Sequence, residues 1–171
     1  MNRMTKILCT AALGCGTIIS VAAHAAVTDS DKTFLTNASA GNLDEIKLGE
    51  LAEQKSTNPQ VKTFAHTMIV QHKMLQQKMA PFAQKWSIVP PTTLNAEDQQ
   101  QFDKLSALSG SEFDKQYVSG AVQAHKQTLD AFNQELNSTT DPQFKQAVMK
   151  GKSVVAAHLK MAESLNAKVS Q

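Results

Sequence analysis

Cysteine is almost absent from this sequence. Its two cysteines, Cys9 and Cys15, both lie near the N-terminus. From residue 16 onward, no side chain can therefore form a disulfide, act as a thiolate nucleophile or bind zinc through sulfur. The C-x-x-C-H pattern that attaches haem covalently is absent as well. Any metal chemistry in that part of the chain must use nitrogen and oxygen ligands or methionine thioethers. Met68, Met79, Met149 and Met161 could soften a copper site, but methionine at helical spacing is far more often core filler.

The short motifs of common enzymes and cofactor-binding proteins are also missing. The sequence contains no G-x-S-x-G, no P-loop, no G-x-G-x-x-G and no H-E-x-x-H. These patterns mark α/β-hydrolases, phosphate-binding loops, dinucleotide-binding domains and zinc proteases. We therefore predict no catalytic residue and no residue that binds an organic cofactor. The interpretation leans away from an enzyme and leaves that question open.

The only extended hydrophobic run lies at the N-terminus and is shorter than a membrane span. Residues 7–23 are uncharged, Arg3 and Lys6 precede them, and Ala23-His24-Ala25 has the A-x-A form of a signal-peptidase site. These are the three parts of a secretory signal peptide. We therefore expect residues 1–25 to be cleaved, and we expect no transmembrane span in the mature chain.

Two other interpretations of the N-terminus remain open. Ala12-Leu13-Gly14-Cys15 is similar to a lipoprotein site, although it lacks the usual aliphatic residue three positions before the cysteine. An uncleaved leader could instead act as an anchor. We expect the protein in the periplasm, and the sequence also allows association with the cell envelope.

The mature chain would be a single domain of residues 26–171, which is long enough to fold on a packed core without cross-links. The whole sequence has 17 basic and 15 acidic side chains, and removal of the leader takes away two of the basic ones. A neutral chain without a basic patch argues against nucleic-acid binding. An envelope protein partner or a homo-oligomer remains allowed.

Helical periodicity is the main positive signal in the sequence. Four long segments carry apolar residues at three- and four-residue steps, and no segment shows the alternation of a β-strand. Asn58-Pro59 and Asp141-Pro142 each combine a cap residue with proline at the first helical position. The segments begin near Asp29, Pro59, Ser111 and Pro142 and end near Ser56, Trp86, Leu136 and Leu165. We predict an all-α fold, a four-helix bundle.

The connection between the second and third segments is long and contains a short extra helix. Pro90-Pro91 marks an extended piece, and Asn95 to Leu108 has the pattern of a polar helix. At about 3.3 Å per extended residue and about 1.5 Å per helical residue, the connection can return along the whole bundle. An up-down order and the crossover of ferritin-like bundles are therefore both allowed. We also expect a kink or break at Gly41-Asn42.

One polar residue able to bind a metal lies near the middle of each long segment. These residues are Glu45, His72, His125 and His158. Each stands about 20 to 24 Å from the start of a helix about 40 Å long, and a midpoint keeps its height when a helix is reversed. Three neutral imidazoles and a carboxylate would suit one zinc, copper or iron ion. Glu45 would complete the shell or orient a histidine, and affinity should fall as pH drops through about 6.5.

A metal-free interpretation competes with this one, because a histidine on an apolar helix face is more often a core residue hydrogen-bonded to a neighbour. The residues three positions before the histidines are Ile69, Val122 and Val155, so the Glu-x-x-His pattern of di-iron proteins is absent. A two-metal oxidase is therefore disfavoured. We take Met161 as part of the inward face of the last segment and Asp114 as part of a solvated face.

The same stretches resemble a family of exported bacterial proteins, domain of unknown function 4142, which is assigned to the ferritin-like bundles. The matching motifs are Glu45 with Leu48-Gly49, Val61-Lys62-x-Phe64-Ala65 followed by Met68 and His72, and Phe113-Asp114-x-x-Tyr117 followed by His125. The resemblance covers about residues 29–168 and implies a helical bundle of the periplasm or envelope, without an activity. Where the family often has Asp-His, this chain has Gln71-His72, so an acidic neighbour of the site is missing.

Two classes of function remain open for an exported bundle of this kind. The first is a protein that binds one transition metal at the mid-bundle layer of Glu45 and the three histidines. The alternative is a non-catalytic structural or interaction protein of the cell envelope, related to stress, with a metal-free polar core. Composition does not separate the two classes.

The predicted signal peptide leads to a mature chain that begins at Ala26, because cleavage follows the A-x-A site. Intact-mass spectrometry of the exported protein should therefore give the mass of residues 26–171. A retained leader, or a lipid on Cys15, would contradict this expectation.

Overall fold

The computed structural model describes residues 27–171 and contains five helices. They are α1 (Asp29–Lys55), α2 (Pro59–Lys85), α3 (Ala96–Ser106), α4 (Gly110–Ser138) and α5 (Pro142–Val169). No strand occurs among these described residues. The predicted all-α bundle of four long helices with a short extra helix is confirmed. The expected signal peptide, residues 1–25, lies outside the described part of the chain.

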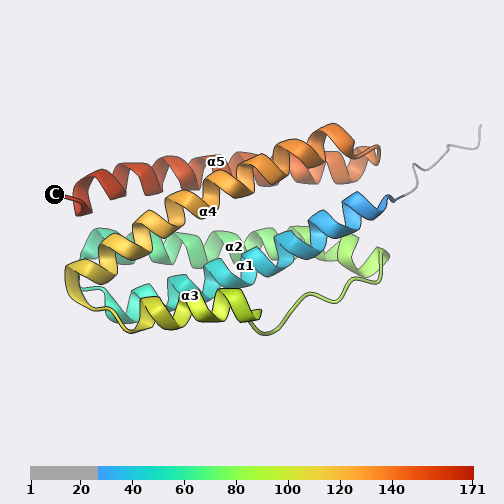
Figure 1. The fold of residues 1–171 in the computed structure, drawn as a ribbon. Helices are drawn as coiled ribbons and strands as arrows, with labels where there is room; N and C mark the ends of the chain where they lie inside the picture. The colour runs from blue at the N-terminus through green and yellow to red at the C-terminus, as the bar shows by residue number, and fades with distance from the viewer. Residues whose placement is uncertain (1–26) are drawn as a thin grey trace, which may run out of the picture.

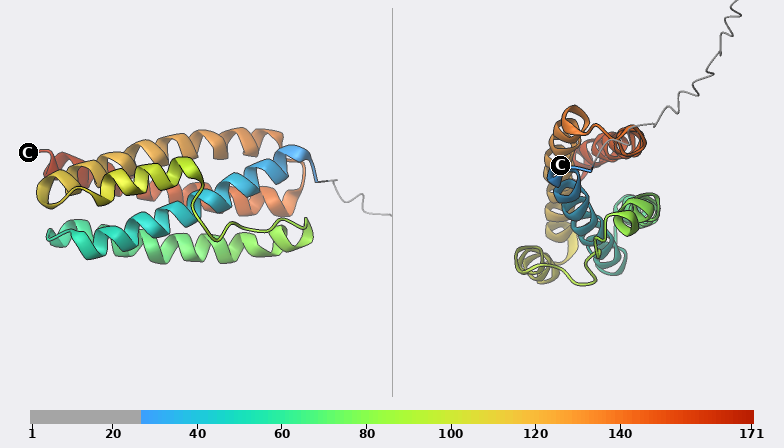
Figure 2. Two further views of the ribbon diagram at one scale, coloured as in Figure 1. Left: turned by 60° about the horizontal axis from the view of Figure 1, so that its bottom comes forward. Right: turned by 90° about the vertical axis from the view of Figure 1, so that its right-hand side faces the viewer.

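The four long helices form a bundle with a ferritin-like crossover (Figures 1 and 2). Helix α1 packs chiefly on α2, and α4 packs chiefly on α5, in each case as an antiparallel pair joined by a short turn. Residues 86–109, which include α3, return along the length of the bundle, so α4 runs parallel to α2 (Figure 1). The two pairs meet where α1 contacts α4 and α2 contacts α5. The crossover is thus the topology adopted.

The helix starts follow local capping chemistry. Asn58 and Asp141 each accept hydrogen bonds from backbone N–H groups of the first turn, and each is followed by proline, as predicted. Helix α1 begins with a capping box between Thr28 and Asp31. The start of α4 differs from the prediction, because Ser109 rather than Ser111 is the N-cap. Gly110 adopts φ +58°, a conformation that favours glycine, where the chain turns into α4.

The expected break at Gly41-Asn42 is wrong, since α1 is continuous from Asp29 to Lys55. Gly41 is exposed, and Asn42 is buried with its side chain bonded to His72. The asparagine therefore has a partner on another helix and does not compete for the backbone of its own helix. Helix α2 likewise continues past Pro81.

Two apolar clusters fill the two halves of the bundle, and a polar layer separates them along every long helix. One cluster consists of buried residues such as Phe64, Met68, Phe113 and Leu165. The other includes Phe34, Phe132, Phe144 and Val155, among others. On each helix the candidate metal residue lies between the members of the two clusters. The layer is therefore buried from both ends of the bundle.

The predicted exposure of Asp114 and the predicted burial of Met161 are both wrong, and the two errors have one cause. Asp114 is only 6% exposed, because α4 contacts α5, α1 and α3 and so buries a wider arc than one stripe. Met161 is 37% exposed, while its neighbour Ala162 is fully buried. Helix α5 packs mainly on α4 and α2, so its buried arc is narrow and Met161 lies beyond its edge. The number of neighbouring helices thus determines how far around a helix the core extends.

Replacement of Phe132 by Ala should destabilise the protein by about 3 to 5 kcal/mol, because it removes a buried ring that packs edge-on against Phe34. Chemical denaturation of the mature protein measures this loss. Met74→Ala, at a half-exposed position of α2, is the control and should change stability by less than about 0.5 kcal/mol. A loss below about 1 kcal/mol for Phe132→Ala would contradict the packing described above.

Candidate metal centre

The polar layer brings together residues from all four long helices. Its histidines are His72 from α2, His125 from α4 and His158 from α5, and each is at most 5% exposed. Glu45 and Asn42 from α1 complete the layer on one side. The predicted mid-height placement therefore gathers all four candidate residues within one buried region. His66, which falls outside the helical stripe, is exposed and contacts Glu53 instead.

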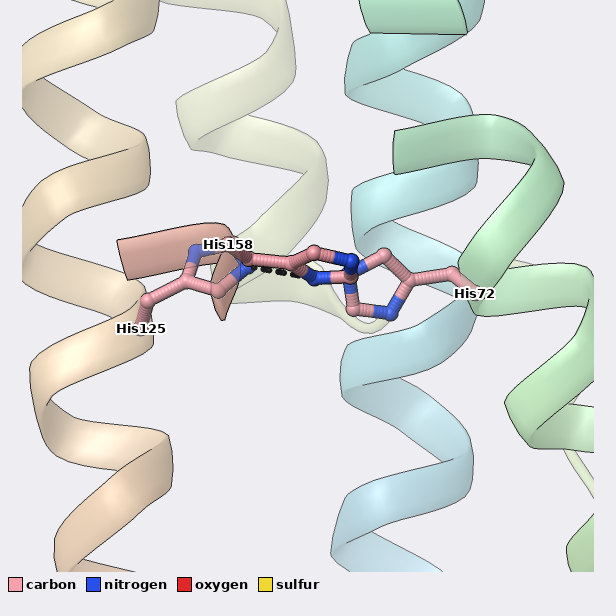
Figure 3. Close-up of side chains that lie close together, drawn as sticks. All are labelled: His72, His125 and His158. Carbon is pink, nitrogen blue, oxygen red and sulfur yellow. Dashed lines mark hydrogen bonds between the residues drawn. The ribbon is translucent and has the colours of Figure 1, made fainter. Parts of the chain in front are cut away.

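The three histidine rings lie close enough to share one ion. One ring nitrogen from each of His72, His125 and His158 lies within 4.8 Å of the others. The ring centroids are 5.7 Å apart for His72 and His125, 5.0 Å for His72 and His158, and 5.3 Å for His125 and His158. Figure 3 shows the rings converging from separate helices, with the contact between His125 and His158 drawn as a dashed line.

One nitrogen of each ring is held by an oxygen atom. His72 Nδ1 lies 2.8 Å from Asn42 Oδ1, His125 Nδ1 lies 2.8 Å from the carbonyl oxygen of Ala121, and His158 Nε2 lies 2.7 Å from Gln71 Oε1. An oxygen of these types only accepts, so with Asn42 and Gln71 in the orientation of this structure each of these ring nitrogens carries the proton and donates. The three hydrogen bonds therefore select one tautomer for each ring.

The other nitrogen of each neutral ring then carries a lone pair. These nitrogens are His72 Nε2, His125 Nε2 and His158 Nδ1. His125 Nε2 and His158 Nδ1 are 3.3 Å apart, and His72 Nε2 is buried without a hydrogen-bond partner. Two nitrogen ligands at about 2.0 Å from a tetrahedral ion are also about 3.3 Å apart. The pair from His125 and His158 thus has the spacing that an ion requires, and one ring nitrogen of His72 lies within 4.8 Å of a nitrogen of each.

Burial keeps the three histidines neutral. It lowers the pKa of His158 to about 4, with the neighbouring His125 as a second cause. It lowers the pKa of His72 well below the usual value, helped by the other two histidines. Burial also lowers the pKa of His125, although the hydrogen bond to Ala121 acts in the opposite direction. Protons should therefore compete with a metal below pH 6.5 rather than at that value, which shifts the sequence-based expectation to lower pH.

Glu45 lies beside one histidine rather than among the three free nitrogens. Its Oε1 atom is 3.4 Å from His125 Nδ1, the nitrogen that donates to Ala121. Among the described residues, the group whose ligand atoms lie within 4.8 Å of one another consists of the three histidines without Glu45. Burial raises the pKa of Glu45 to about 8, so its carboxyl group is largely protonated at pH 7. This position suits the orientation of His125.

Two residues of the layer were missed by the sequence analysis. Asn42 was interpreted as a weak point of its helix, and Gln71 as the loss of an acidic neighbour, yet both supply the oxygen that holds a histidine. Asn42 and Glu45 are three residues apart and so share one helix face. That spacing was the available signal for Asn42. Gln71 lies three residues after Met68 and four before Leu75, so helical spacing placed it at the edge of the inward stripe of α2 and was the available signal there as well.

The fold and the buried three-histidine layer define a class of small helical-bundle proteins with a candidate metal centre. The chain belongs to the family described as domain of unknown function (DUF4142), whose model matches residues 17–165. No curated protein sequence matches it. Among the residues described, no helix combines the length and the apolar character needed to cross a membrane.

Solved structures with the same fold come from a related helical family and from a copper protein. A DUF305 fragment from Deinococcus radiodurans is 12% identical, with a TM-score of 0.72 over 82% of this chain and 97% of that one. A DUF305 protein from Streptomyces coelicolor is 11% identical, with a TM-score of 0.71 over 82% and 92%. CopM in its Cu(I)-bound form is 21% identical, with a TM-score of 0.66 over 78% and 93%. At these identities the likeness shows the fold.

The free energy of unfolding of the wild-type protein should fall as pH rises, because Glu45 loses its proton less readily in the folded state. Glu45→Gln should remove this fall. The folded carboxyl group keeps its proton up to about pH 8, whereas an unfolded one loses it near pH 4.5, so the folded state binds more protons between these values. Stability therefore falls with rising pH, by up to about 1.4 kcal/mol per unit. Chemical denaturation of the metal-free proteins measures this effect. The free energy of unfolding of the variant relative to the wild type should be higher at pH 7.5 than at pH 5.5.

Glu112→Gln is the control for this comparison, because Glu112 is exposed on α4 and lies outside the layer. Its stability relative to the wild type should be the same at both pH values. A Glu45→Gln variant that behaves in the same way would show that the carboxyl group is ionised in the folded protein.

Proposed function

We propose that this protein is an exported protein of the periplasm that binds one transition-metal ion through His72, His125 and His158. The observation that carries the proposal is the set of three converging lone pairs, each on a ring whose other nitrogen donates to an oxygen. Metal-bound histidines typically have such an acceptor, which fixes the tautomer and the direction of the ring. Glu45 has the role of positioning His125.

The donor set limits the choice of metal. Three neutral imidazoles without a sulfur ligand suit zinc, copper or iron, and they fit magnesium or calcium poorly because those ions prefer oxygen. CopM, a protein of the same fold, is known in a Cu(I)-bound form. Copper and zinc are therefore the first ions to test. The proposed role is that of a small metal-binding or metal-buffering protein rather than an enzyme.

Export is supported by the signal-peptide pattern of residues 1–25. The Streptomyces neighbour is itself named as a candidate secreted protein. A metal bound after export would have to be taken up from outside the cytoplasm, where a site without cysteine has the advantage of being insensitive to thiol oxidation.

A metal-free interaction protein is the second candidate, and one contact favours it. If the amide group of Gln71 is rotated, its nitrogen donates to His158 Nε2, and His158 Nδ1–H can then donate to His125 Nε2 across their 3.3 Å contact. The layer would then be a hydrogen-bonded network, with only His72 Nε2 left without a partner. Such a network would fix the register of the helices for a structural role.

Calorimetric titration of zinc and copper into the metal-stripped mature protein separates the two candidates. We expect one ion per chain and a raised melting temperature, because an ion held only by the folded state stabilises it. Asn42→Ala should weaken binding by about 10- to 100-fold, since His72 loses the acceptor that orients it.

His66→Ala is the matched control, because His66 is exposed and lies outside the layer, and it should leave the affinity unchanged. The variant with His72, His125 and His158 all changed to Ala is the reference for binding elsewhere on the chain. Wild-type protein that binds no tighter than this triple variant would favour the metal-free network.

A further inference from the structure

A cavity of about 530 Å³ lies between α1 and α4 and reaches the histidine layer from one side. The rings of His72 and His125 form part of its inner wall, together with Asn42 and Glu45. His158 is not part of the wall. The cavity therefore meets the candidate metal centre on the side of His72 and His125.

The wall of the cavity combines apolar side chains, uncharged amide and hydroxyl groups, and carboxyl groups. Phe34, Leu75 and Phe132 contribute apolar surface, and Asp44 and Glu45 contribute carboxyl groups. No lysine or arginine lines it. A small anion would find neither an opposite charge nor the basic donors that anion sites use. The wall favours an uncharged organic molecule that can bury its body and present one donor atom.

Gly41 is an exposed residue of the cavity wall. This glycine lies in the interior of α1, where glycine is among the least favourable residues, and it is exposed. A Cβ atom built there would have no heavy atom within 4 Å, so helix packing does not require the absence of a side chain. Gly41 also lines the cavity. The absence of a side chain at Gly41 therefore leaves open space at the wall of the cavity.

We propose that the metal ion has a free coordination position facing this cavity and binds a small uncharged nitrogen donor there. This inference rests on the proposed function. Three histidines leave at least one position of a tetrahedral ion open, as in zinc sites that bind an exchangeable ligand. Glu45 lies beside His125 Nδ1 and outside the group of three, so it leaves that position free. Imidazole, a compact uncharged donor, is the probe of choice.

The experiment uses the copper(II)-loaded mature protein and follows its visible and electron paramagnetic resonance spectra. Addition of ¹⁵N-imidazole should shift the copper band and add the coupling of one ¹⁵N nucleus, while the copper stays on the protein. Azide, an anionic ligand of similar size, should bind more weakly than imidazole.

Gly41→Phe and Gly120→Phe form a matched pair of variants. Both place the same ring at an exposed helical position where a Cβ meets nothing within 4 Å, but only Gly41 lines the cavity. Gly41→Phe should weaken imidazole binding by at least about tenfold, because the ring occupies the path of the ligand. Gly120→Phe should bind imidazole like the wild type, and both variants should bind copper with unchanged affinity.

Several outcomes would overturn the inference and leave the metal site standing. They are an unchanged copper spectrum on addition of imidazole, removal of the copper by imidazole without a ternary complex, tighter binding of azide than of imidazole, and equal imidazole binding by the two phenylalanine variants. A wild-type protein that binds no copper would overturn the proposed function, and this inference with it. That failure is seen before any imidazole is added.

Discussion

The hydrogen bond from His125 Nδ1 to the carbonyl oxygen of Ala121 determines much of the chemistry of the layer. A backbone carbonyl in a helix cannot donate, and its position is fixed by the turn that contains it. His125 must therefore carry its proton on Nδ1, which leaves Nε2 free and directed toward His158. The backbone imposes only this one tautomer, and the orientation of the Asn42 and Gln71 amides sets the other two. The layer is thus anchored to the main chain of α4.

The layer is stable only because it is bounded by apolar packing and internally paired. Burial of a polar group without a partner is costly, and each of the three rings has one nitrogen bonded to oxygen. The aromatic contacts of Phe132 and Phe144 fill one half of the bundle, and Phe113 and Tyr117 fill the other. The layer is thereby shielded toward both ends of the bundle, and this burial lowers the basicity of the histidines. Stability and site chemistry have one physical origin.

Helix number, the helix starts at Pro59 and Pro142, and the height of the candidate residues could be predicted from the sequence. Proline after Asn58 and Asp141 marks a helix start locally, and a rise of about 1.5 Å per residue converts sequence position into height. The partners of the histidines could not be predicted, because spacing along one helix does not say what the neighbouring helix offers at the same level. The exposure of Met161 and the burial of Asp114 depend on how many helices contact each element, which is a property of the whole topology.

The pairing of α1 with α2 and of α4 with α5 has a mechanical consequence. Gly49 lets α1 approach Ile69 of α2 closely, and Gly151 does the same for α5 against Phe132 of α4, so each hairpin is tightly joined within itself. The seam between the two hairpins is the looser plane, and the cavity lies in it. His72 belongs to one hairpin, and His125 and His158 belong to the other. An ion bound by all three histidines would cross-link the two hairpins across that seam. Its binding and release would therefore change the stiffness of the whole bundle.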